Sequence, residues 1–141
     1  MVRRSIASAL LASAILIGSA GAASAAEVFT AELQGEEEVP VRGDLDGTGF
    51  AVVAAIPEVG LVCYGVVVFG IAPANAAHIH EAPRGVAGPV VVPLQAPTSG
   101  DSAGCVSNQA EAEDIAENPS DYYVNVHNAE FPGGALRGQL G

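Results

Sequence analysis

Residues 49–71 read GFAVVAAIPEVGLVCYGVVVFGI, two apolar runs separated by residues that favour a turn. The runs 49–56 and 61–71 are rich in β-branched residues, which favour strands. Shorter apolar or alternating runs lie elsewhere, with glycine and proline between them. Many short strands without long helical stretches predict an all-β fold, an antiparallel sandwich or barrel instead of a parallel α/β sheet. The further strand candidates are VFTAEL at 28–33, VVVPL at 90–94 and YYVNVH at 122–127.

One segment favours a helix. QAEAEDIAENP at 109–119 contains good helix formers and stops before Pro119, so we expect a short connecting helix there. The sequence shows no internal repeat, heptad pattern or interdomain linker. We therefore expect residues 27–141 to form one domain, a normal size for a single core.

The first 26 residues resemble a secretory signal peptide. Two arginines lie within Met1–Arg4, residues 5–17 are almost wholly apolar, and Ala23-Ser24-Ala25 matches the small-residue cleavage pattern. Cleavage is expected near Ala25 or Ala26. No second long apolar run follows, so the mature protein is expected to be secreted or periplasmic and not inserted in a membrane.

The mature chain is strongly acidic. Without Arg3 and Arg4 it keeps three arginines and no lysine against 16 acidic residues, a net charge of 3 − 16 = −13. Nucleic acids and anionic membranes require lysine and arginine to replace their counterions. Both are therefore excluded as partners, and the acidity suits solubility or the attraction of cations.

Cys63 and Cys105 are the only cysteines. Export places them in an oxidising compartment, where an even count favours a disulfide, and two cysteines allow one pairing. The alternative is ligation of a metal by reduced thiolates.

Two of the three histidines lie in AHIHEA, residues 77–82. In a strand, His78 and His80 would share one face about 6.6 Å apart. In YYVNVH the same alternation places His127 on one face together with Tyr123 and Asn125. If the two strands pair in register, the three imidazoles form a site that can hold copper or zinc through three nitrogens.

Three separated stretches carry a resemblance to a known family. FTAELQGEEEVP, AHIHEAPRGVAGPVVVPL and NPSDYYVNVHNAEFPGGALRGQL closely resemble the chordin-type domain family, CHRD. The chain departs from the family pattern at EVPV, residues 38–41, and at Asn128, where members often have EVPP and threonine. The resemblance implies an extracellular Ig-like or copper-zinc-dismutase-like β-sandwich and little about activity. It makes copper the first metal candidate.

Other interpretations of the histidines remain open. They could be structural and form hydrogen bonds with carbonyls or with Glu81, Asn125 or Glu130. In a metal site, Glu81 and Asn125 would instead be the candidates that hydrogen-bond and orient the histidine ligands. The domain would then be an extracellular protein-interaction module without a metal. A copper-dependent dismutase-like enzyme is the third class, but only Arg42, Arg84 and Arg137 could steer an anion.

Two further motifs have ordinary explanations. The run Glu36-Glu37-Glu38 is expected to be a solvated edge, since adjacent strand residues face opposite ways. Arg42-Gly43-Asp44 spells a tripeptide that cell-adhesion receptors read, but its composition is that of a turn.

Overall fold

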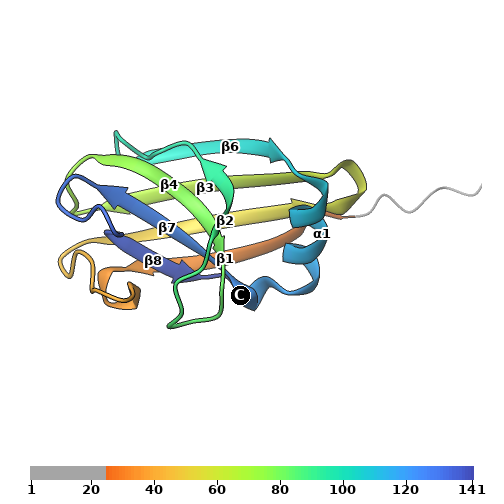
Figure 1. Cartoon of the computed structure of the whole chain (residues 1–141). Coiled ribbons are helices and arrows are strands. Elements are labelled where there is room, and N and C mark those ends of the chain that lie inside the picture. Colours follow the sequence, from red (N-terminus) through yellow and green to blue (C-terminus); the bar gives the residue numbers. More distant parts are fainter. Residues whose placement is uncertain (1–24) are drawn as a thin grey trace, which may run out of the picture.

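The computed structural model describes residues 25–141. All but the last two residues of the expected secretory signal, 1–26, lie outside this range. Eight strands, one α-helix and three short 3-10 turns make up the fold (Figure 1). The strands are β1 (Glu27–Gln34), β2 (Thr48–Ile56), β3 (Leu61–Phe69), β4 (Ala74–Glu81), β5 (Val90–Leu94), β6 (Asp101–Ser107), β7 (Tyr122–Asn128) and β8 (Leu136–Gln139).

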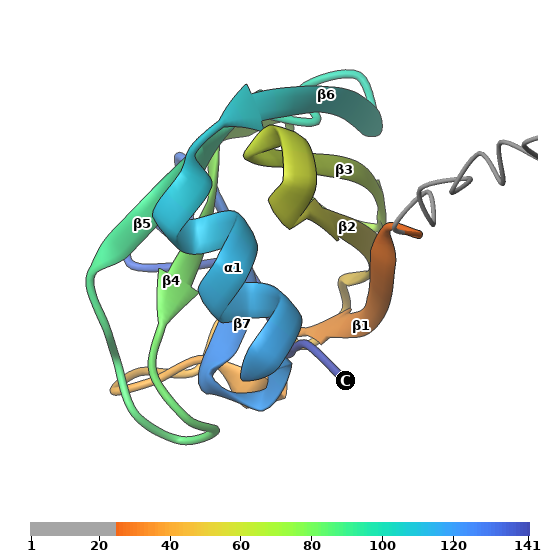
Figure 2. The ribbon, with the colours of Figure 1, turned by 90° about the vertical axis from the view of Figure 1, so that its right-hand side faces the viewer.

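All strand pairs are antiparallel, in the order β5-β4-β7-β8-β1-β2-β3-β6. β1 and β8 share only one register pair, Gln34 with Arg137, so the sheet divides there into two halves. We call them the disulfide half-sheet (β1, β2, β3, β6) and the histidine half-sheet (β5, β4, β7, β8). Viewed from one end, the halves curve around a common interior (Figure 2). The predicted antiparallel all-β sandwich with one short helix is confirmed.

The core lies between the two half-sheets. Alternation along each strand sends one set of side chains inward, and these are mostly valine, alanine, leucine and isoleucine. Tyr64 and Phe29 pack against this core at its margins. The fully buried side chains include Leu33, Val53, Val62, Val66, Ile79, Val92, Val124, Val126 and Leu136.

The predicted helix exists and covers one end of the sandwich (Figure 2). α1 runs over Gln109–Glu117 and, as expected, stops before Pro119, which begins a 3-10 turn. The side chain of Asn108 caps its first turn by accepting a hydrogen bond from the Glu111 amide. Ile115 is fully buried and anchors the helix to the core. No helix among residues 25–141 is both long and apolar enough to cross a bilayer.

Strand β6 was not among the predicted strands. Its sequence, DSAGCVS, is poor in β-branched residues, so its pairing with β3 comes from tertiary context. That pairing places Cys63 directly opposite Cys105, and the two form the predicted disulfide. Among the described residues no cysteine is free, which leaves no thiolate for a metal.

Candidate metal site

The three histidines lie on the outer face of the histidine half-sheet. Ala77 and Ile79 of β4 point into the core, so His78 and His80 between and after them point outward. β7 pairs with β4 so that His127 stands opposite Ala76, two residue pairs along the ladder from His78 and therefore on the same face. The assumed register is therefore right, and one ring nitrogen of each histidine lies within 4.8 Å of the others.

The closest contact in this group joins His78 to His127. Nδ1 of His78 lies 3.2 Å from Nε2 of His127. Two nitrogens bound tetrahedrally to one zinc, at about 2.0 to 2.1 Å from the metal, stand roughly 3.3 Å apart. The spacing therefore suits two ligands of one ion as well as it suits a hydrogen bond between the rings.

Backbone carbonyls fix the protons of two rings. His80 Nδ1 lies 2.9 Å from the carbonyl oxygen of Gly88, and His127 Nδ1 lies 3.1 Å from that of Pro132. A carbonyl only accepts, so each Nδ1 carries the hydrogen and each Nε2 keeps its lone pair. Metal-bound histidines usually donate their other N–H in this way.

His80 Nε2 is the most informative atom of the group. It is buried and has no hydrogen-bond partner, although buried polar atoms are normally paired. An unpartnered lone pair beside two other imidazoles is the donor set that a borderline metal ion such as copper or zinc prefers.

Burial also determines the charge of the three rings. It lowers the pKa of His78, and the nearby His127 and His80 lower it further. It lowers the pKa of His80 and of His127 as well, outweighing in each case the carbonyl bond that raises it. The imidazoles are therefore neutral at pH 7, the state in which they can bind a metal.

A stack of side chains supports His80 from one side. The ring of Tyr123 lies parallel to the imidazole of His80, with centroids 4.8 Å apart. The guanidinium carbon of Arg137 sits 3.5 Å from the centroid of the same tyrosine ring. The Tyr123 hydroxyl accepts a hydrogen bond from the amide of Gly88 at 3.1 Å. Gly88 therefore holds His80 through its carbonyl and Tyr123 through its amide.

Arg137 ties the loop at residues 82–89 to the sheet. Its guanidinium donates to the carbonyl oxygens of Val86 at 2.8 Å and Pro83 at 3.1 Å, and the residue is 1% exposed. Arg137 is thus held by backbone carbonyl oxygens beneath the loop and is not available to steer an anion. Because Arg84 pairs with Glu37, only Arg42 among the described arginines is left to steer an anion.

The hydrogen bonds of the two predicted supporting residues go to groups other than the histidines. Asn125 stands opposite His78, but its amide donates to Glu38 and to the carbonyl oxygen of Leu136 at 3.1 Å. Glu81 points the other way along β4, toward Glu111, whose pKa is raised by burial and, to a smaller extent, by the charge of Glu81. The third candidate, Glu130, lies on the rim of a neighbouring pocket.

Glu38 corrects the interpretation of the acidic run. Gly35–Glu37 forms a 3-10 turn, so Glu38 does not continue a strand edge and is only 5% exposed. Burial raises its pKa to about 7, against the lowering effects of Arg137 and of the hydrogen bond from Asn125. Gly134, at φ 140°, leaves room for the carboxyl, which a Cβ at that position would strike.

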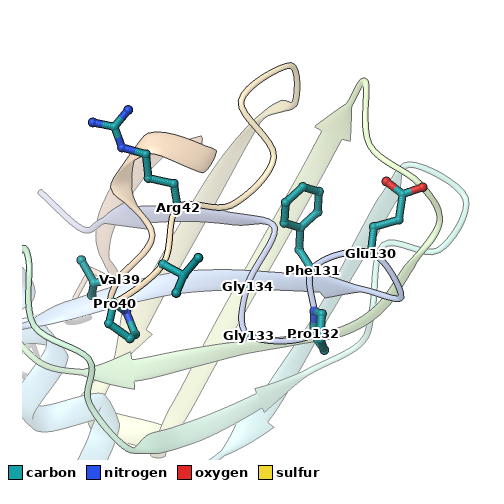
Figure 3. A pocket seen from close by; sticks show the side chains of 9 residues that line it. Val39, Pro40, Arg42, Glu130, Phe131, Pro132, Gly133 and Gly134 are labelled. Atoms are coloured by element: carbon teal, nitrogen blue, oxygen red, sulfur yellow. The ribbon is translucent and has the colours of Figure 1, made fainter.

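A pocket of about 320 Å³ lies between two loops beside the histidines (Figure 3). Its walls are largely apolar, and the labelled side chain of Phe131 stands across it from Val39 and Pro40. Pro132, whose carbonyl holds His127, belongs to the same wall, so the pocket adjoins the site without including it. The lining residues are Val39, Pro40, Val41, Arg42, Glu130, Phe131, Pro132, Gly133 and Gly134.

The Arg42-Gly43-Asp44 triplet lies at this pocket and is not a free loop tip. Gly43 is buried and donates to the carbonyl of Gly35 at 2.8 Å, and the amide of Asp44 donates to that of Ala135 at 2.9 Å.

Several contributors to the site carried no signal in the sequence. The backbone carbonyls of Gly88 and Pro132 could not be predicted from the sequence, because every residue has a carbonyl. Tyr123 was detectable, since alternation along β7 places it on the face of His127.

Comparison with protein-family models matches residues 29–140 to the CHRD domain. No curated protein and no solved structure matches the chain. The CHRD domain is not a known enzyme family. The match spans β2 to β8, all but the first two residues of β1, and every residue of the site, and the chain therefore belongs to the CHRD domain family.

Proposed function

We propose that the protein is an exported domain that binds one copper or zinc ion through His78, His80 and His127. The observation that carries this proposal is the buried, unpartnered Nε2 of His80 beside two further imidazoles. Two of the rings already donate Nδ1–H to backbone carbonyls, which leaves each Nε2 with its lone pair.

The donor set argues for the metal class. Three neutral imidazoles suit copper and zinc, whereas calcium and magnesium take oxygen ligands. Copper is the first candidate, because a nitrogen site binds Cu²⁺ more tightly than Zn²⁺. A further coordination position would remain for water or a ligand.

The proposed location is extracellular or periplasmic. The expected signal peptide, the disulfide and membership of the CHRD domain family all support export.

The test is metal binding by the processed chain, purified without a histidine tag. We expect one copper or zinc ion per chain and at least a hundredfold weaker binding in the His78→Ala, His127→Ala double variant, roughly tenfold per lost ligand. Asn75→Ala, an exposed change on the same strand, is the control and should bind like the wild type. Weak and equal uptake by wild type and double variant would refute the proposal.

Metal affinity should also fall with pH. A proton competes with the metal for each imidazole, and burial lowers the pKa of all three histidines. Lowered pKa values keep the rings neutral further into the acid range, so affinity should hold as pH drops to about 6.5 and be lost below it. Titration of metal into the protein at several pH values measures this. Affinity retained at about pH 4.5 would contradict ligation by histidine.

A protein-interaction module without a metal is the second candidate. The apolar pocket between the loops at 39–42 and 130–134 favours it, because such a pocket can accept an apolar side chain. In that case the metal-free protein and the double histidine variant would bind the partner equally well.

A further inference from the structure

The outer face of the disulfide half-sheet is unusually apolar. Strands buried on one face alternate between apolar and polar residues, whereas strands buried on both faces read as continuous apolar runs. β2 (TGFAVVAAI) and β3 (LVCYGVVVF) are continuous in this sense. Only one of their faces lies in the core, so the sequence indicates that the other face is also covered.

The strand register defines this outer face in rows. The first row is Val28, Ala54, Cys63 and Cys105; the second is Thr30, Val52, Gly65 and Ala103; the third is Glu32, Phe50, Val67 and Asp101. Phe69 continues the face beyond the third row, opposite Thr48. Four of these apolar side chains are well exposed: Val28 at 59%, Phe50 at 41%, Val67 at 38% and Phe69 at 64%.

The two outer faces of the sandwich differ in how they are covered. The outer side chains of the histidine half-sheet bond to loop residues such as Val86, Gly88 and Pro132. Among residues 25–141, no loop or helix lies over the outer face of β2 and β3, which form part of the rim in Figure 2. Its cover must therefore come from another molecule.

Charge points to the identity of that molecule. The mature chain carries a net charge of −13, so two copies repel each other over most of their surfaces. The three rows hold only two acidic residues, Glu32 and Asp101, at opposite ends of one row and on the two outer strands. This is the face on which a second copy can approach with the least repulsion.

We propose that the protein forms a homodimer in which these outer faces stack about a twofold axis. The axis runs along the second row, where Gly65 and Ala103 are small. A twofold rotation about this row exchanges its two sides. The third row of each copy therefore lies on the first row of the other copy, and each strand lies on the same strand of the other copy. Phe50 then faces the second copy's Ala54, so that large side chains meet small ones and the acidic residues avoid each other at the rim.

The size of the face predicts a weak dimer. Four strands about 4.8 Å apart and seven residues long, at about 3.3 Å per residue, cover roughly 450 Å² in each copy. The total of roughly 900 Å² lies below a standard interface of about 1,600 Å², which suggests dissociation in the micromolar range.

Sedimentation equilibrium of the processed chain over a range of concentrations tests the dimer. We expect a monomer–dimer equilibrium that tightens as salt is added, because salt screens the repulsion between two acidic copies. Val67→Asp should weaken it at least about a hundredfold, since it would place an unpaired carboxylate in the interface.

Val41→Asp is the matched control. Val41 is 76% exposed but lies outside the three rows, so dimerisation should be unchanged. If Val67→Asp does not fold, methyl NMR of the wild type gives the answer, because Val52 and Val67 should shift with concentration and Val41 should not. A chain that stays monomeric at about 1 mM, far above micromolar dissociation, would overturn the proposal and assign the face to a different partner.

Discussion

Arg137→Met should lower the free energy of unfolding by about 3 to 5 kcal/mol, the range for removing one partner of a buried charged network. The methionine fills much of the space but donates no hydrogen bonds. The carbonyls of Val86 and Pro83 would lose their donors, and Tyr123 would lose the cation over its ring. Denaturant unfolding of both proteins measures the difference.

The loss should be larger at pH 8 than at pH 6. Burial already raises the pKa of Glu38 to about 7, and Arg137 is the main influence that lowers it. Without the arginine that pKa rises further. At pH 6 the folded-state carboxyl is protonated in both proteins, whereas at pH 8 the variant must either keep this proton or ionise the carboxyl without its cation, and both cost free energy. Glu38→Gln in the Arg137→Met background should recover part of the loss at pH 8, because the amide carries no charge.

Arg84→Met provides the matched control. Arg84 is exposed and pairs with Glu37 at the surface, so its removal should change stability by less than about 1 kcal/mol. The Arg137 variant should also bind metal about tenfold more weakly, because the loop that carries Gly88 would hold His80 less firmly. A loss of less than about 1 kcal/mol at pH 8 would show that Arg137 is not a structural anchor.

The position of the histidines was predictable because it depends only on local alternation. In a strand, residues two apart share a face, so AHIHEA and YYVNVH each fix which side their histidines occupy. The pairing of β4 with β7 was an assumption, since 39 residues separate the two motifs and no local rule links them. Val124 and Val126 are apolar, so the face of the strand that carries them must point into the core and the face with His127 must point outward. This made the assumed register plausible.

The rest of the site depends on tertiary contacts that carry no local pattern. Glu38 looked like one of three solvated acids, but a 3-10 turn directs it inward to Asn125. Arg137 was one of three arginines that could steer an anion, but it is buried and donates to the carbonyl oxygens of a loop. A buried polar side chain becomes recognisable only when its partners are known, because polar residues are exposed by default.

The three sequence stretches that resemble the family each provide a different part of this site. The first provides Glu38, the second His78 and His80 together with Gly88, and the third His127 with Pro132 and Arg137. The strands place them on one outer face and the loops supply the carbonyls. The polar residues of the family pattern therefore gather over the histidine half-sheet, although the first stretch begins in β1 of the disulfide half-sheet.

Replacing both cysteines, as Cys63→Ala with Cys105→Ala, should lower the free energy of unfolding by about 4 kcal/mol, the chain-entropy value for a loop of this length. The bridge joins residues 42 positions apart and holds β6 against β3. β6 is an edge strand with few β-branched residues, so its amides should lose the most protection in hydrogen exchange. Reduced wild type should behave like the variant. Metal affinity should be unchanged, because the histidines lie on the other half-sheet. Loss of metal binding in the cysteine variant would instead support thiolate ligation. A stability loss of less than about 1 kcal/mol would show that packing alone holds β6.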